Sequence, residues 1–438
     1  MKLFQKIAVG YLLFVAVLVL GVMIGQSMWL PFSVAREIKD FIDYSAGKDN
    51  SVFEKLQSDF GGTPHRFLYE YEPLAATGML EMKIFGLKDR RAQPLLRLSQ
   101  DAPRGYRVLF GAFDFEDTFW GAVLIDSNGK VINTWHLSTD GLPLSSEPDI
   151  RKNMYGVDIL ADGSVIFLMQ EEGGGIIKID YCGDIVWTLD GSYHHAVSLT
   201  GEGSFWTLEG SQGAFDPILA LIDVNTGKVL KRIDMRNVRA ANPDTHIFDL
   251  QRQKNADHAA HGNDIDPLPK HLVAEFPQFA RGDLLISYHT TNLVFVLDPN
   301  TLKIKWWRIG PWDRQHDPDW NLGGYISVFS NNQRGVGEHS NIIAIDPQTI
   351  KFENMVAGSR YEFFSRINGM HEVTNAGTIL VTSTTQGRIF EVNGDGKVVF
   401  DFVNLFDADV NQTLHVSNAR FLGPEFFQFE ELPSCEDP

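Results

Sequence analysis

Histidine stands at the start of an apolar strand five times along the chain, at His195, His261, His316, His371 and His415. The five segments read HHAVSLTGEGSFWTLEG, HGNDIDPL, HDPDWNLGGYISVFSNN, HEVTNAGTILVTSTT and HVSNARFLGPEFF, and an earlier copy, MYGVDILADGSVIFLMQ, has Tyr155 in this place. A neutral imidazole can act as a nucleophile, shuttle a proton or bind a metal. If the copies surround a common axis, these side chains converge, and the sequence predicts a site built from residues far apart in the chain.

An arginine follows one of these strands, as Arg334 in NNQRG after the strand that begins at His316. A guanidinium is a planar fork that binds two oxygens of a carboxylate, phosphate or sulfate. We therefore expect His316 and Arg334 to hold a tetrahedral anion while a neutral histidine acts as nucleophile. We do not expect a metal, because a zinc centre takes only three or four close ligands and an arginine repels a cation. The alternative is that duplication copied a histidine that only packs.

The elements that position these residues are hairpins, which recur six times after residue 105. They read WGAVLIDSNGKVINTW, GIIKIDYCGDIVWTL, PILALIDVNTGKVLKRID, NLVFVLDPNTLKIKWWRI, NIIAIDPQTIKFENMV and RIFEVNGDGKVVFDF. Each has an apolar strand, an Asp or Asn, a turn, and a second strand. Repeats of roughly 45 to 60 residues with three or four strands are typical of β-propellers. We predict an all-β, six-bladed β-propeller over residues 105–438, closed by pairing of GYRVLFGAF with a strand near Ala419. A β-sandwich does not explain the regular repeat.

The N-terminal quarter of the chain has a different character. Lys2 and Lys6 precede IAVGYLLFVAVLVLGVMIG, and no further charge occurs before Arg36. This length suits a membrane-spanning helix, and the lysines favour a cytoplasmic N-terminus. We expect residues 1–34 to be an uncleaved membrane anchor, with the propeller on the periplasmic, extracytoplasmic side; a cleaved signal peptide is the alternative. Residues 35–104 have apolar residues at helical spacing and predict a short, mostly helical stalk.

Composition excludes one class of partner. The chain has 38 basic and 56 acidic residues, a net charge of −18. Nucleic acid is therefore not an expected partner. Cys182 and Cys435 are too few for a disulfide framework, and the sequence leaves open whether they pair.

The repeat and its histidines resemble those of the bacterial arylsulfotransferases. The similarity covers roughly residues 105 to 430 and is most specific in QHDPDWNLGGYISVFSNNQR, where one blade carries both a histidine and an arginine. The resemblance implies an exported, six-bladed propeller enzyme that moves a sulfuryl group from an aryl sulfate to a phenolic acceptor. It implies no nucleotide donor and no cofactor.

The resemblance also implies roles for single residues. His261 matches the first active-site histidine of the family, and His316 with Arg334 matches the pair that holds the sulfuryl oxygens. His371 is the expected nucleophile, with His415 in reserve. The residues expected to bind substrate are His195, His415, Asn263 and Tyr155. The chain departs from the family in its predicted anchor and stalk, which stand where the periplasmic enzymes carry a β-domain, so the oligomeric state is not transferred.

Two other functions are compatible with the same residues. One is a non-catalytic propeller that binds an anionic ligand or a partner protein in its channel. The other is a propeller oxidoreductase or lyase with a bound cofactor or metal. No P-loop or dinucleotide-binding motif is present in the sequence.

Overall fold

The computed structural model describes residues 65–66, 79–83, 95–114, 118–137, 155–169, 174–210, 217–248, 261–332, 339–407, 412–429, 433 and 435. The predicted anchor at 1–34 lies outside these ranges, and so does Arg334. Within the described ranges, no helix is both long enough and apolar enough to cross a bilayer. The anchor therefore stays a prediction.

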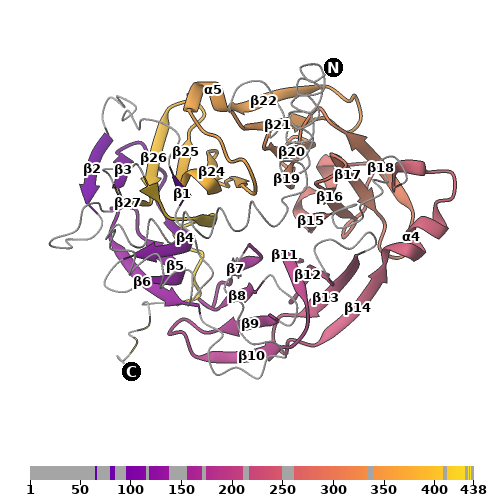
Figure 1. Cartoon of the computed structure of the whole chain (residues 1–438), viewed down its shortest axis with the longest axis horizontal. Helices are drawn as coiled ribbons and strands as arrows, with labels where there is room; N and C mark the ends of the chain where they lie inside the picture. Colours follow the sequence, from indigo (N-terminus) through magenta and orange to yellow (C-terminus); the bar gives the residue numbers. More distant parts are fainter. Residues whose placement is uncertain are drawn as a thin grey trace, which may run out of the picture. The chain divides into compact units, whose positions relative to one another are not determined.

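Six antiparallel sheets surround a common axis, each running from an inner to an outer strand (Figure 1). Blade 1 contains β7 (Val157–Ile159), β8 (Val165–Leu168), β9 (Ile176–Ile179) and β10 (Ile185–Leu189). Blade 2 contains β11 (Tyr193–Leu199), β12 (Ser204–Glu209), β13 (Ile218–Asp223) and β14 (Val229–Asp234). Blade 3 contains β15 (Gly262–Pro267), β16 (Leu284–Tyr288), β17 (Leu293–Leu297) and β18 (Ile304–Ile309).

The second half of the ring repeats this order. Blade 4 contains β19 (His316–Asn321), β20 (Tyr325–Ser330), β21 (Asn341–Ile345) and β22 (Phe352–Ala357). Blade 5 contains β23 (Met370–Val373), β24 (Ile379–Ser383), β25 (Arg388–Val392) and β26 (Val398–Val403). Blade 6 contains β29 (Val416–Leu422), β4 (Tyr106–Asp114), β5 (Thr118–Ile125) and β6 (Val131–His136). The prediction of a six-bladed propeller is confirmed.

Blade 6 joins the two ends of the repeat region. Its inner strand β29 pairs with β4 over the register Val416↔Gly111 to Leu422↔Tyr106. The last strand of the chain thus completes the sheet that the first propeller strands begin, as the sequence predicted. Short helices lie between the strands: α4 (Met235–Ala241), α5 (Gly358–Tyr361), and the 3-10 turns η1 (His246–Phe248), η3 (Lys270–Glu275) and η4 (Thr384–Gln386).

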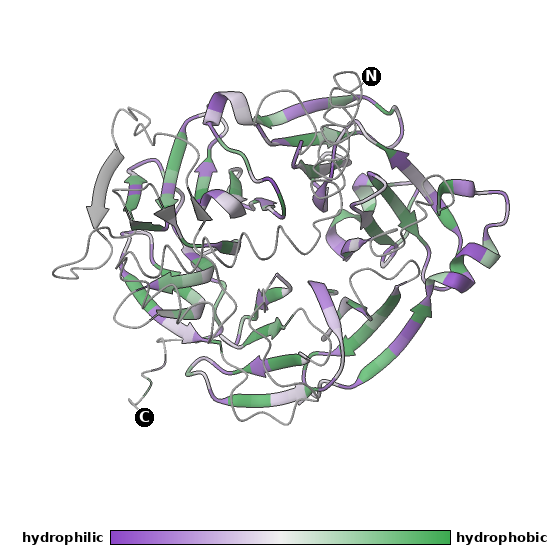
Figure 2. Ribbon diagram, in the orientation of Figure 1, coloured by the Kyte–Doolittle hydropathy of each residue, from purple (hydrophilic) through white to green (hydrophobic). Residues whose placement is uncertain are grey.

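The Asp or Asn of each hairpin ends a strand by bonding the backbone of its own turn. Asp126 accepts hydrogen bonds from the N–H groups of Asn128 and Lys130, both at 2.8 Å. Asp180 and Asn393 do the same in their turns. These Asx turns explain why the sequence signal marked the hairpins correctly. Hydrophobic residues dominate the blade strands (Figure 2), which pack face to face with neighbouring blades into the core.

Part of the predicted helical stalk consists of strands. β3 (Leu95–Ser99) pairs with β26 at the outer edge of blade 5, and β2 (Met79–Lys83) pairs with β3. Leu96 and Leu98 alternate inward and pack with Phe400 and Phe402. Burial of every second residue is the pattern of a strand. LLRLS therefore forms a strand, although the helical spacing of apolar residues in 35–104 predicted a helical stalk. A small third sheet contains β1 (His65–Arg66), β28 (Gln412–Thr413) and β27 (Leu405–Asp407).

The two cysteines form a disulfide. Cys182 lies in the turn between β9 and β10, and Cys435 lies in the C-terminal tail, 253 residues later. The bond ties the end of the chain to blade 1 and answers the question that the sequence left open.

Candidate functional site

The inner strands are irregular where they begin. The pairing register shifts between His194 and Ser198 in β11, and between His316 and Asp319 in β19. Similar shifts occur in β15 and β29. His195 and His261 have left-handed backbones, with φ of 65° and 50°. Bulges of this kind re-aim side chains, and these turn the histidines toward the propeller axis.

The aromatic rings at these positions form a chain around the channel, which we call the histidine collar: Tyr155, His195, His261, His289, His316 and His415. Ring centroids are 5.0 Å apart for His195 and His261, 5.1 Å for His261 and His289, and 5.1 Å for His289 and His316. Tyr155 lies 5.4 Å from His415 and 6.3 Å from His195. The structure thus brings together Tyr155 and four of the five histidines that the repeat pattern marked.

His289 is the member of the collar that the sequence analysis missed. It follows β16 rather than preceding an inner strand, so it lies outside the repeat pattern. Its backbone N–H donates to the His261 carbonyl at 3.0 Å, which places it at the same end of blade 3. Arg314 Nη1 lies 3.4 Å from the His289 Nδ1 atom and brings a cation to the collar.

His316 has a defined tautomer. Its Nδ1 atom lies 2.7 Å from Asn331 Oδ1. The amide nitrogen of Asn331 donates to the carbonyls of Ser365 at 2.8 Å and Asn368 at 2.5 Å, so Oδ1 must face the imidazole. Since an amide oxygen only accepts, His316 Nδ1 carries the proton and the neutral ring has its lone pair on Nε2. Burial lowers the pKa of His316 to about 4, so the ring is neutral at pH 7.

His194 and His195 are neutral as well. His195 Nε2 lies 3.3 Å from His261 Nε2, and His195 Nδ1 lies 2.9 Å from His194 Nδ1. In each pair one nitrogen donates and the other accepts. Burial lowers the pKa of His194 to about 3, and burial together with the neighbouring imidazoles holds the pKa of His195 well below its ordinary value. Asn263, predicted to bind substrate, is buried and donates to the Gln315 carbonyl at 2.8 Å.

His371 lies apart from the collar. β23 pairs with β24 in regular register and has no bulge. Aligned by register, His371 therefore takes the place of Val157 and Val197 in other blades, not that of His195. Its Nδ1 atom lies 2.9 Å from Asp317 Oδ2, and its Nε2 atom is 2.6 Å from a serine hydroxyl, that of Ser327.

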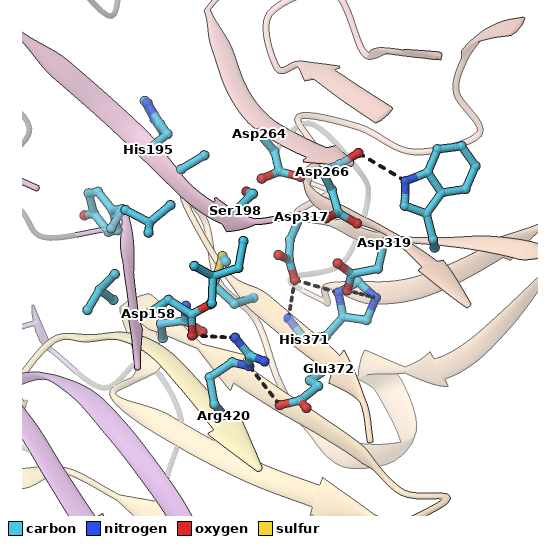
Figure 3. Close-up of a pocket in the computed structure, with 18 of the residues that line it drawn as sticks. Asp158, His195, Ser198, Asp264, Asp266, Asp317, Asp319, His371, Glu372 and Arg420 are labelled. Carbon is cyan, nitrogen blue, oxygen red and sulfur yellow. Dashed lines mark hydrogen bonds and ion pairs between the residues drawn. The ribbon is translucent and has the colours of Figure 1, made fainter. Parts of the chain in front are cut away.

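Beside His371 the inner strands line a pocket of about 300 Å³ (Figure 3). Aligned through the turn residues of each blade, one equivalent position carries Asp158, Ser198, Asp266, Asp319, Glu372 and Arg420. We call this the acidic pocket; it also contains Asp264 and Asp317. Tyr155 and His195 line it too, so it adjoins the collar.

The charges of the acidic pocket divide into two groups (Figure 3). Arg420 pairs with Asp158 at 2.6 Å and with Glu372 at 3.4 Å, and these contacts raise its pKa. Asp317 and Asp319 lie beside His371 instead, at 2.9 Å and 3.6 Å, and Asp264 and Asp266 line the same pocket. Burial, followed by repulsion from Asp317, raises the pKa of Asp266 to about 7 and that of Asp264 and Asp319 well above the ordinary value.

A signal for the acidic pocket was present in the sequence but not used. A polar residue follows three positions after the histidine or tyrosine of every repeat: Asp158, Ser198, Asp264, Asp319, Thr374 and Asn418. The spacing alone does not distinguish a residue that faces the axis from one in a turn, and the bulges change this spacing between blades.

The comparisons with known proteins add the family. The family described as Arylsulfotransferase (ASST) matches residues 156–405, which is more than half of the chain. The protein belongs to the arylsulfotransferase family. Membership of this family indicates an enzyme that transfers sulfuryl groups. Comparison with curated proteins finds no match.

Solved structures resemble this chain weakly. A protein of unknown function from Bacteroides caccae is 12% identical over 73% of this chain and 99% of its own, with a TM-score of 0.49. TolB from Acinetobacter baumannii is 12% identical over 73% and 67%, with a TM-score of 0.45. Virginiamycin B lyase from Staphylococcus aureus is 13% identical over 57% and 69%, with a TM-score of 0.34. These similarities carry no information on function.

Proposed function

We propose that the protein transfers a sulfuryl group from an aryl sulfate to a phenol at the histidine collar, without a nucleotide donor, through a sulfated His316. The observation that carries this proposal is the hydrogen bond from His316 Nδ1 to Asn331, which leaves a lone pair on Nε2 of a neutral ring. A nucleophile must have its reacting atom unprotonated and its orientation held. Asn331 supplies both conditions.

The charge distribution supports the collar over the acidic pocket as the place where sulfate binds. The collar contains the neutral imidazoles of His195 and His316 and lies beside Arg314, and the predicted clamp Arg334 follows Asn332 by two residues in the chain. The acidic pocket contains six carboxyl groups and would repel an aryl sulfate. His371, the nucleophile expected from sequence, has both ring nitrogens in hydrogen bonds beside those carboxylates, so the geometry supports His316 instead.

The reaction then has two displacements at sulfur. His316 Nε2 attacks the sulfur of the donor, the bond from sulfur to the aryl oxygen breaks, and the aryl group leaves as a phenolate. An acceptor phenol next attacks the same sulfur, the bond from nitrogen to sulfur breaks, and the phenolic proton passes to a neutral collar histidine, which returns it to the phenolate or to solvent. The contact between His195 and His261 offers a route for that proton. Arg314 and Arg334 would stabilise negative charge on the sulfuryl oxygens.

We also propose that the propeller works outside the cytoplasm. The apolar segment at 7–25 supports an N-terminal anchor, and the disulfide between Cys182 and Cys435 is of a kind that persists in oxidising compartments.

The test is covalent labelling of the purified full-length chain. The protein is mixed with a nitrophenyl sulfate and no acceptor, and peptides are analysed for an added sulfuryl group. We expect the label on the peptide that contains His316, release of nitrophenol on addition of a phenol, and loss of both in His316→Ala. His271→Ala, at an exposed histidine in η3, serves as the matched control.

Two results would contradict the proposal. A label on the peptide of His371 or His415 would retain the sulfotransferase and reject His316 as nucleophile. No label, together with no nitrophenol released when phenols are supplied, would reject catalysis and favour a propeller that only binds an anionic ligand.

A further inference from the structure

The carboxylates around His371 are arranged as a ligand set. Asp317, Asp319 and His371 each offer one ligand atom, and the three atoms lie within 4.8 Å of one another. The side chain of His371 is fully buried, and its backbone N–H donates to Asp317 at 2.5 Å. The imidazole lies between Asp317 and Asp319, at 2.9 Å and 3.6 Å (Figure 3). The three groups are thus held in place before any ligand arrives.

Asp264 is a separate indication that something binds here. It is only 8% exposed, and it lines the same pocket. Among the described residues no side chain bonds its carboxyl group, which accepts only the N–H of Ile265. A buried carboxyl with no cationic partner is costly, and such groups are usually paired or coordinate metals. Asp264 therefore points to a positively charged ligand in the pocket.

The balance of charge leads to the same expectation. Arg420 compensates Asp158 and Glu372 on one side of the pocket. On the other side, Asp317 and Asp319 share the His371 imidazole, and Asp264 and Asp266 line the same pocket without an ion pair among the described residues. A bound cation would offset the repulsion among these carboxyl groups.

We propose that the acidic pocket binds one divalent cation through Asp317 and Asp319, with Asp264 and His371 completing or orienting the ligand set. Carboxylate oxygens are the ligands of Ca²⁺, Mg²⁺ and Mn²⁺, which sets the chemical class of the ion. His371 ligates through Nε2 if it gives up Ser327, and otherwise orients Asp317 through Nδ1. From the sequence we did not expect the repeated histidines to bind a metal together, and this site instead uses carboxylates that lie beside the collar.

The cation has a consequence for the proposed reaction, although its binding does not depend on that reaction. The acidic pocket adjoins the collar through Tyr155 and His195. An ion there offsets the negative charge that would repel an aryl sulfate. We therefore expect chelation to raise KM for the aryl sulfate more than it changes kcat.

The test uses the full-length chain, stripped with EDTA and then titrated with Ca²⁺, Mg²⁺ or Mn²⁺. Calorimetry and the Mn²⁺ electron paramagnetic resonance signal report binding without any assay of activity. We expect one ion per chain and a higher melting temperature. Asp319→Asn and Asp264→Asn should each weaken the affinity by about tenfold or more. Circular dichroism checks that each variant is folded. Because two ligand variants are made, the proposal can still be tested if one of them does not fold.

Asp158→Asn is the matched control. It removes the same charge from the equivalent position of another blade, but from a residue that is paired with Arg420. If Asp319 is a ligand of the ion, Asp158→Asn should change the affinity for the divalent cation much less than Asp319→Asn does. Equal losses in the two variants, or no saturable binding of any of the three ions to the wild-type chain, would overturn the proposal. Labelling of His316 in the stripped protein tests the sulfuryl transfer separately.

Discussion

Replacing Asn331 with alanine separates the catalytic and structural roles of one buried side chain. The change removes three hydrogen bonds: one from His316 Nδ1 at 2.7 Å, and two to the carbonyls of Ser365 and Asn368. Each is worth about 1 kcal/mol. The free energy of unfolding should therefore fall by about 3 kcal/mol, plus a contribution from the cavity. Only the first bond bears on the tautomer of His316.

The catalytic part of the loss follows from that one bond. Without Asn331 the transition state, in which the His316 ring gains positive charge, loses the hydrogen bond from Nδ1, which is worth about 1–2 kcal/mol. Because 1.36 kcal/mol corresponds to a factor of ten, kcat/KM for an aryl sulfate should fall by roughly 5- to 30-fold. The assay is nitrophenol release with a phenol acceptor, measured well below the melting temperature of the variant.

Asn404 offers the matched control. It is buried, and its amide nitrogen donates to the carbonyls of Ala112 and Leu414 at 2.8 and 3.4 Å, with no histidine on its oxygen. Asn404→Ala should lose comparable stability and keep kcat/KM. If Asn331→Ala lost stability without losing activity, or if both variants lost activity alike, the role given to Asn331 would be refuted.

Three further predictions follow from burial and charge. The rate of His316 labelling should be constant from pH 5 to 7 and should fall as pH drops through the His316 pKa of about 4. A pH–rate profile measures this, and a fall in rate that begins near pH 6.5 would contradict it. The Asp266 pKa is raised to about 7, so its contribution to stability is present at low pH and is lost as pH rises toward 7. Asp266→Asn in chelator should therefore be more stable than wild type at pH 8 and equal to it near pH 4, measured by urea unfolding, and the opposite order would reject the sign. Arg107→Met should lower the free energy of unfolding by about 3–5 kcal/mol in the same assay. The variant leaves the buried Glu391 carboxylate, which lies 2.6 Å from the Arg107 guanidinium, without its charge partner. An unchanged free energy of unfolding would contradict this.

The sequence predicted the parts of the fold that depend on local signals. Each Asp or Asn at a strand end bonds its own turn, so the hairpins could be recognised one at a time. The number of hairpins then predicted the number of blades. The strand at 95–99 was missed because five residues of alternating Leu are a weak signal beside longer helical patterns.

One assumption, that residues at equivalent repeat positions meet at the axis, predicted the histidine collar correctly and the place of His371 incorrectly. Radial repetition brings equivalent positions together, and His195, His261, His316 and His415 do converge. Whether a residue is equivalent depends on bulges that no local pattern reveals. β23 lacks the bulge of its neighbours, so His371 lies among the carboxylates.

The amino-acid sequence by itself determined the repeat, the turns, the apolar strand cores and the residue types available for chemistry, because these depend on side chains a few positions apart. Only the tertiary structure decided which polar residues meet. His289 joined the collar, Asn331 turned toward His316, and Asp317 and Asp319 met at the His371 imidazole. Those contacts depend on strand register and on the angle between blades, and both are set by packing across the whole ring.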